Sequence, residues 1–154
     1  MSLLQRAFEI IGLRNGGGPH RGHALRVFLL DDDERRHEWF MKRFSRDDLD
    51  IAKDVPEATA LLSRKPYDAI FLDHDLLPEH YEADAPADDE RTGYAVAVWL
   101  STRRDLQQES RIVVHTRNAD GAMRMVEELR RSGRQADYVP FTVLSQRITS
   151  VWKR

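Results

Sequence analysis

Residues 26–33 read RVFLLDDD, and this stretch decides how the rest of the sequence is interpreted. Residues 27–30 are all apolar, without alternation, which is typical of a strand buried on both faces of a parallel sheet. Three aspartates follow at once. In parallel sheets covered by helices, ligands bind beyond the carboxyl ends of the strands. We therefore expect a functional site where this strand ends.

The rest of the chain alternates between short apolar runs and segments of helical periodicity. Further strands are predicted over residues 49–52, 67–72, 112–114 and 136–139. Helices are predicted over residues 34–44, 57–63, 92–103, 119–131 and 142–152. Such alternation implies an α/β fold with a parallel sheet, helices on both faces and right-handed crossovers. Residues 78–91, with six acids and two prolines, are expected to form a long exposed loop.

Composition limits the class of protein. A length of 154 residues fits one domain, and a net charge of −2 argues against binding nucleic acid through bulk charge. The absence of cysteine excludes disulfides, thiol catalysis and cysteine-ligated metal centres. No uncharged stretch is long enough for a membrane helix, and the N-terminus is unlike a signal peptide. We expect a cytoplasmic protein with no membrane or nucleic-acid partner.

The first 25 residues are interpreted as an added arm. Residues 3–13 fit a short amphipathic helix, and residues 15–23, NGGGPHRGH, are too rich in glycine for a stable element. The predicted organisation is an N-terminal helical arm with a glycine-rich linker over residues 1–25, followed by one domain over residues 26–154.

Acidic side chains follow two of the predicted strands. Asp31, Asp32 and Asp33 come after the first strand, and Asp73 and Asp75 come after the third. Asp33 is interpreted as the N-cap of the next helix. Carboxylates from neighbouring strands repel one another unless a cation lies between them. Oxygen-only ligands suit Mg²⁺, with Mn²⁺ as the alternative, so the cluster predicts a divalent-cation site.

Two histidines stand at the same strand ends. His74 follows Asp73, and His115 follows the fourth strand. Imidazole titrates near neutral pH, so either histidine is a candidate general acid or base. Asp75 is a candidate to orient one of them.

Several other polar residues need an interpretation, and two of them have two. Thr116 offers a hydroxyl group to an anion. Asn118 either caps the following helix or helps that helix N-terminus to bind a phosphate. His37, one turn into the first helix, either lines the same edge or is structural. The arginine-rich residues 130–134 are interpreted as a solvated helix end.

These motifs resemble the receiver domain of bacterial response regulators over residues 26 to about 153. VFLLDD is similar to the first receiver strand with its acidic pair, which implies that Asp31 and Asp32 bind a metal ion. DAIFLDHDLLP is similar to the third strand, which places the phosphoacceptor at Asp73. Thr116 matches the hydroxyl residue after strand four. The implied fold is a flavodoxin-like three-layer sandwich with a five-stranded parallel sheet in the order 2-1-3-4-5.

The departures from an ordinary receiver point to a narrower family. Val139 stands before Pro140, where receivers carry a lysine that pairs with the phosphoryl group. LDHDL, TGYAVAVWL and VHTRNADGAMRM together look like the cyclic-phosphate processing receiver domains. That resemblance implies a small cyclic phosphate as substrate.

Three functions follow as hypotheses. In the first, Asp31, Asp32 and Asp73 hold a divalent cation and a histidine moves the proton in hydrolysis of a cyclic phosphate. In the second, Asp73 accepts a phosphoryl group and the domain signals through a protein partner. In the third, the domain binds a protein partner without phosphorylation. The third ranks last because the clustered acids would lack a counter-charge.

Overall fold

The computed structural model describes residues 24–82 and 90–151. The predicted arm helix and linker, and their boundary with the domain, lie outside these residues or at their edge. The strands form one parallel five-stranded sheet in the order β2-β1-β3-β4-β5, which confirms the predicted topology. They are β1 (Arg26–Leu30), β2 (Asp48–Ala52), β3 (Ala69–Leu72), β4 (Arg111–Val114) and β5 (Gln135–Tyr138).

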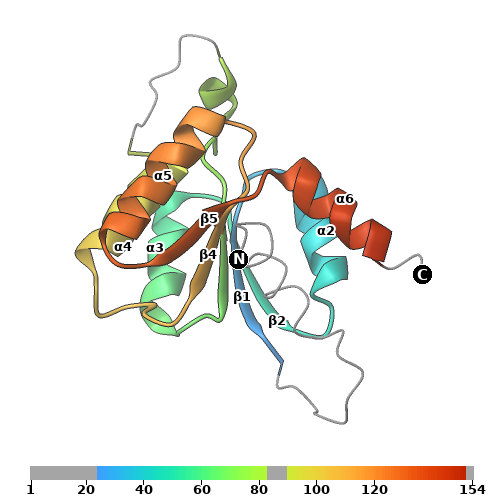
Figure 1. Ribbon diagram of the computed structural model, residues 1–154, viewed down its shortest axis with the longest axis horizontal. Coiled ribbons are helices and arrows are strands. Elements are labelled where there is room, and N and C mark those ends of the chain that lie inside the picture. The colour runs from blue at the N-terminus through green and yellow to red at the C-terminus, as the bar shows by residue number, and fades with distance from the viewer. Residues whose placement is uncertain (1–23, 83–89, 152–154) are drawn as a thin grey trace.

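Helices cover both faces of the sheet, as Figure 1 shows. They are α2 (Glu34–Arg43), α3 (Val55–Arg64), α4 (Gly93–Thr102), α5 (Ala119–Arg131) and α6 (Phe141–Val151), with a short 3₁₀ helix, η1 (Pro78–Tyr81). Helices α3, α4 and α5 lie on one face, and α2 and α6 lie on the other. None of the helices in the described part of the chain is long and apolar enough to span a bilayer.

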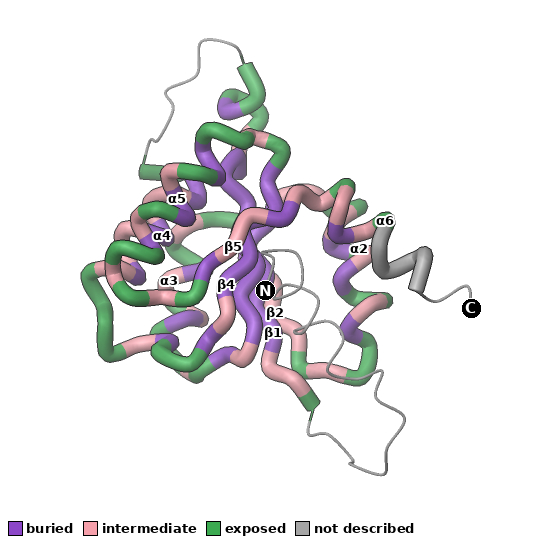
Figure 2. Tube along the Cα trace, in the orientation of Figure 1, coloured by how far each residue is buried: buried purple, intermediate pink, exposed green. Residues whose placement is uncertain are grey.

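Each face of the sheet has its own apolar core, because successive strand side chains point to opposite faces. Phe28 and Leu30 belong to the core under α3, α4 and α5. Val27 and Leu29 belong to the core under α2 and α6. Residues 27–30 of β1 and 69–72 of β3 are therefore all buried, which is why they read as continuous apolar runs (Figure 2).

Aspartate side chains cap the starts of two helices. The Asp33 side chain accepts hydrogen bonds from the amides of Arg35 and Arg36 at the start of α2. Asp54 accepts a hydrogen bond from the amide of Glu57, and this cap lets α3 begin at Val55, two residues before its predicted start. Such side-chain oxygens satisfy amides that have no partner inside the helix.

The segment predicted as one exposed loop begins differently. Residues 78–81 form η1, and His80 is buried there. Its Nδ1 accepts hydrogen bonds from the amides of Leu76 and Leu77, 3.1 and 3.2 Å away. The histidine thus satisfies backbone donors that an exposed loop would leave to water.

The arginines after α5 are not simply solvated. Arg134 donates to the carbonyl oxygens of Leu100, Arg103, Leu106 and Gln107, at 2.8 to 2.9 Å. The guanidinium therefore ties the residue before β5 to the last turn of α4 and to the segment that follows α4. Its planar fork suits several carbonyl acceptors at once.

Candidate metal and phosphate site

The sheet register decides which polar side chains meet at the carboxyl end of the strands. Leu30 pairs with Leu72, and Leu72 pairs with Val114, so Asp31, Asp73 and His115 follow at the same level. The backbone continues this alignment, because the Asp73 amide donates to Leu30 and the His115 amide donates to Leu72. Strand alternation then places all three side chains on the face of the sheet that α2 and α6 cover.

Asp31 is fully buried and accepts four hydrogen bonds. Its Oδ1 accepts from the Asp33 amide and from Arg36 Nη2, both at 2.8 Å. Its Oδ2 lies 2.7 Å from Arg36 Nε and 2.7 Å from His115 Nε2. Burial opposes ionisation, but the hydrogen bonds from His115 and Arg36 outweigh it and hold the pKa of Asp31 at about 2. Asp31 is therefore a carboxylate at neutral pH.

Arg36, on the first turns of α2, is the cation of this site. Its Nη2 lies 2.8 Å from Asp31 Oδ1, 3.1 Å from Asp73 Oδ2 and 3.8 Å from Asp32 Oδ1. The side chain is 14% exposed. The expectation that the acids lack a counter-charge without a metal ion is therefore wrong, because the chain supplies a guanidinium to all three.

Asp73 lies at the buried end of β3. Its Oδ1 accepts from the His74 amide at 2.9 Å, and its Oδ2 pairs with Arg36. Burial raises the pKa of Asp73 to about 6, and the negative charge of Asp31 adds to this, against the opposing effects of His115, Arg36 and a hydrogen bond with Thr116. Asp73 can therefore gain or lose a proton near neutral pH.

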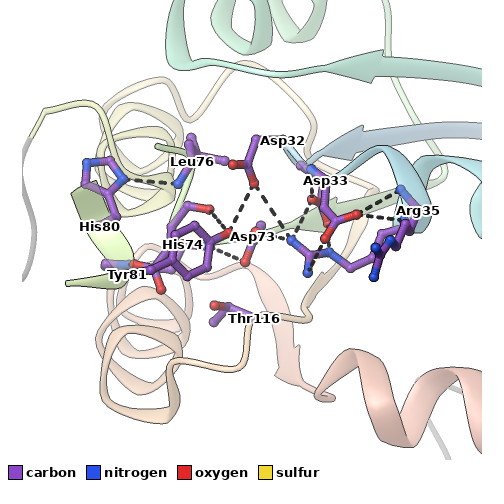
Figure 3. Close-up of polar contacts among 12 residues, drawn as sticks. Asp32, Asp33, Arg35, Asp73, His74, Leu76, His80, Tyr81 and Thr116 are labelled. Atoms are coloured by element: carbon purple, nitrogen blue, oxygen red, sulfur yellow. Dashed lines mark hydrogen bonds and ion pairs between the residues drawn. The ribbon is translucent and has the colours of Figure 1, made fainter. Parts of the chain in front are cut away.

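Asp32 is only partly buried and forms the outer side of the cluster (Figure 3). Burial raises its pKa, and the charge of Asp31 raises it further. The Tyr81 hydroxyl lies 3.2 Å from Asp32 Oδ1 and 3.0 Å from the carbonyl oxygen of Asp75. η1 therefore brings an aromatic side chain, more than half exposed, to the edge of the acid cluster.

His74 lies on the opposite face of the sheet from Asp73, as alternation requires for the next residue. Its Nδ1 is 2.7 Å from Asp75 Oδ1, and the side chain is almost completely buried. A Cβ atom at Gly121, in the first turn of α5, would come within 2.6 Å of the His74 ring. The two predicted histidines are thus separated: His115 joins the acids, and His74 joins Asp75 beneath α5.

Two close backbone approaches hold this end of the sheet. A Cβ atom at Gly93 would lie 1.8 Å from the carbonyl oxygen of Asp73, so the first residue of α4 has to be glycine for this approach. The Gly93 amide donates to the carbonyl of His74 at 2.8 Å. The position of α4 therefore depends on the backbone of Asp73 and His74.

Thr116 and Asn118 both form hydrogen bonds in the turn that leads into α5. Thr116 is buried beside Asp73, and its Oγ1 accepts from the Asn118 amide at 3.2 Å. The Asn118 side-chain oxygen caps α5 by accepting from the Gly121 amide, and its Nδ2 lies 3.4 Å from His74 Nδ1. Capping of α5 is thus established for Asn118.

His37 has a backbone partner. Its Nε2 lies 2.6 Å from the carbonyl oxygen of Asp31, so it supports the strand end and does not extend the acid cluster. Val139, at the position of the receiver lysine, is fully buried in the apolar core under α2 and α6. Among the described residues, the cation facing Asp73 therefore comes from α2 and not from the end of β5.

The donor set fits a divalent cation. Asp31, Asp32 and Asp73 each offer a carboxylate oxygen, and these oxygens lie within 4.8 Å of one another. Oxygen-only donors of this kind suit Mg²⁺ or Ca²⁺. Arg36, which sequence reasoning missed, uses the same oxygens. Its place in the first turn of the helix that directly follows the three aspartates was the available signal.

The sequence matches the family model described as "Cyclic-phosphate processing Receiver domain" over residues 26–131. A search of curated proteins found no match.

Solved structures with a similar fold are receiver domains. A response regulator from Burkholderia pseudomallei with a phosphorylated aspartic acid, calcium ion and citrate has a TM-score of 0.54 and 19% identity, over 74% of this chain and 58% of that chain. The receiver domain of a LuxO repressor protein from Vibrio parahaemolyticus has a TM-score of 0.56 and 16% identity, over 83% and 86%. A CheY-like receiver domain from Methylobacillus flagellatus has a TM-score of 0.55 and 16% identity, over 83% and 98%. At these identities the likeness establishes the fold alone.

Proposed function

We propose that this chain, which belongs to the family of cyclic-phosphate processing receiver domains, hydrolyses a cyclic phosphate to a phosphate monoester with a divalent cation as cofactor. The observation that carries the proposal is the cluster of Asp31, Asp32 and Asp73, whose ligand oxygens lie within 4.8 Å of one another. The family description supports the substrate class, and the donor set supports the cofactor.

The chemistry sets what the residues have to do. Hydrolysis adds one water to the cyclic ester: the water oxygen bonds to phosphorus, one ring P–O bond breaks, and the leaving oxygen gains a proton. A divalent cation held by Asp31, Asp32 and Asp73 would supply charge stabilisation for the phosphoryl oxygens. The chain itself has to take a proton from water and return one to the leaving oxygen.

His115 is the group proposed to handle these protons, with Asp73 acting as a ligand of the cation. His115 Nε2 is bonded to Asp31, and within the described residues its Nδ1 has no hydrogen-bond partner. Nδ1 is therefore the ring atom that we propose for the proton transfer.

His74 and Asp75 are proposed to act through position. Their pairing at 2.7 Å lies under α5, on the other face of the sheet from the Asp73 carboxylate. The His74 amide nevertheless donates to Asp73 Oδ1, so the His74–Asp75 pair holds the backbone that orients the acid. Thr116, beside Asp73, is proposed to donate its hydroxyl to a phosphoryl oxygen, with Asn118 holding the turn through its amide.

Phosphorus NMR of the full chain with a panel of cyclic phosphates and Mg²⁺ or Mn²⁺ tests the proposal. We expect new monoester signals with the wild type and none with Asp73→Asn. The matched control is Glu38→Gln, which removes an exposed acid from α2. Turnover by Asp73→Asn at the wild-type rate would exclude the assigned role of Asp73.

A second function, phosphorylation of Asp73 in signalling through a protein partner, is favoured by the contacts of that carboxylate. Thr116 and Arg36 both face it, and they offer a hydroxyl donor and a cation to a phosphoryl group. Intact-mass measurement after exposure to a small phosphodonor distinguishes the two. A stable gain of one phosphoryl group, lost in Asp73→Asn, would support phosphorylation; no gain and no turnover would leave partner binding alone.

A further inference from the structure

We infer that Arg36 is an internal competitor of the divalent cation: it binds the carboxylates in the metal-free protein, and a cation has to displace it from Asp31 and Asp73 to bind there. The inference rests on the metal site of the proposed function. It identifies Arg36 as the residue that sets the affinity of that site for the cation.

The hydrogen-bond capacity of Asp31 is the first argument. A carboxylate has about four lone-pair positions. All four are used, by the Asp33 amide, His115 Nε2, and Nε and Nη2 of Arg36. Asp31 can therefore bind a cation only after one of these donors leaves. The Asp33 amide is part of the backbone at the start of α2, and His115 is fixed at the end of β4, so the long side chain of Arg36 is the donor best able to move.

The position of Arg36 Nη2 is the second argument. This single atom lies 2.8, 3.1 and 3.8 Å from oxygens of Asp31, Asp73 and Asp32, the same three residues that form the candidate metal site. A cation that binds those oxygens would be within a few ångströms of a positive guanidinium. At such separations like charges in a partly buried site repel strongly.

Charge balance is the third argument. Three carboxylates face one guanidinium, so the cluster has more negative than positive charge when all three are ionised. A divalent cation neutralises the cluster better than a monovalent side chain. The guanidinium Nη1 also lies 3.5 Å from Asp33 Oδ2, and the Asp33 side chain is 38% exposed, so Arg36 has a partner nearer the surface than the buried acids.

Mn²⁺ binding to the full chain, measured calorimetrically at constant ionic strength, tests the inference. Arg36→Gln removes the competing charge, and we expect it to bind Mn²⁺ about tenfold more tightly than the wild type, since charge-assisted hydrogen bonds to Asp31 no longer have to break. Arg35→Gln makes the same charge change at the neighbouring exposed position and should leave the affinity within about twofold, because an exposed charge is well screened.

A second readout is thermal unfolding without and with Mn²⁺. Without metal, Arg36→Gln should melt below the wild type, because its buried acids lose their cation. With saturating Mn²⁺ the difference in melting temperature between Arg36→Gln and the wild type should become smaller or change sign. Arg36→Lys keeps the charge but cannot bind both oxygens of Asp31 as a fork, so it serves if the glutamine variant does not fold. It should also bind Mn²⁺ more tightly than the wild type.

The outcomes separate this inference from the proposed function. Equal or weaker Mn²⁺ binding by both Arg36 variants, with clear binding by the wild type, would overturn the competition and leave the metal site standing. No Mn²⁺ binding by any variant would overturn both. Tighter binding by Arg36→Gln and not by Arg35→Gln supports the competition.

Discussion

His115 Nε2 lies 2.7 Å from Asp31 Oδ2, and neither side chain is exposed. The pair joins the end of β4 to the end of β1 across β3, which lies between them in the sheet. Phe40 and Phe141 flank the imidazole, with ring centroids 5.7 and 6.5 Å away. A charged acid is therefore held beside an apolar core by hydrogen bonds from this ring and from Arg36.

Breaking this pair should destabilise the fold. His115→Leu leaves Asp31 ionised with one partner fewer, and we expect a loss of about 1.5–3 kcal/mol in the free energy of unfolding. Urea unfolding of His115→Leu, Asp31→Asn and the double variant measures the coupling. The double variant should lose less than the sum of the two single variants. Additive losses would show that the 2.7 Å contact contributes little.

Ionisation of Asp73 should make the folded protein less stable as the pH rises. Burial raises the pKa of Asp73 in the folded protein from 3.8 to about 6, so the folded state binds this proton more tightly than the unfolded chain. Its contribution to stability is present below about pH 4 and is lost as the pH rises through about 6. Asp73→Asn should therefore be more stable than the wild type at pH 7, and the difference should disappear near pH 4. Urea unfolding from pH 4 to 8 measures this, and a less stable Asp73→Asn at pH 7 would contradict the assignment.

Asp31 should act in the opposite direction over a lower range. Hydrogen bonds from His115 and Arg36 overcome the effect of burial and lower its pKa from 3.8 to about 2. The stabilisation is present above about pH 4 and is lost as the pH falls through 2. The effects of Asp31 and Asp73 on stability can be told apart. Asp73→Asn should abolish the loss of stability above pH 4 and retain the loss of stability at lower pH.

Gly121 should be required by the ring of His74. Alanine is usually better than glycine inside a helix by roughly 0.5–1 kcal/mol. At Gly121, however, the added Cβ would lie 2.6 Å from the His74 ring, and overpacking of this kind costs about 1–3 kcal/mol. We expect Gly121→Ala to lower the free energy of unfolding in the wild type and to raise it in a His74→Ala background. If Gly121→Ala destabilises the protein equally in both backgrounds, a clash with the His74 ring is not the cause.

Arg134 should contribute more to stability than Arg131, although the two are only three residues apart in sequence. Arg134→Gln loses hydrogen bonds to carbonyl oxygens of the segment after α4, and we expect a loss of about 1–3 kcal/mol. Arg131 pairs with Glu127 and Glu128 at a site where its side chain is 67% exposed. Arg131→Gln should therefore change stability by less than about 0.5 kcal/mol. Equal effects in thermal unfolding would contradict the proposed tie between Arg134 and this segment.

Strand positions and the acid cluster were predictable because they depend on local patterns. A continuous apolar run such as residues 27–30 can be stable only when buried on both faces, and the parallel fold then brings residues after different strands to one edge. Caps such as Asp33 were predictable for the same reason, since the helix start needs a nearby acceptor.

The separation of the two histidines needed the register of the strands. Because Leu72 pairs with Val114, His115 aligns with Asp73, and His74, one residue further, faces the opposite side. A shift of one residue in this pairing would have exchanged the two faces. The register follows from which side chains fill each core, so it depends on contacts between segments far apart in sequence.

By itself, the sequence determined that Asp31, Asp32 and Asp73 would stand at one end of a parallel sheet, because strand periodicity and chain order are local properties. Only the tertiary structure decided that Arg36 turns inward to neutralise them. An arginine on the first turn of a helix has many rotamers of similar energy in isolation. The buried carboxylates of two different strands select one of them, since an unpaired buried charge is far less stable than a paired one.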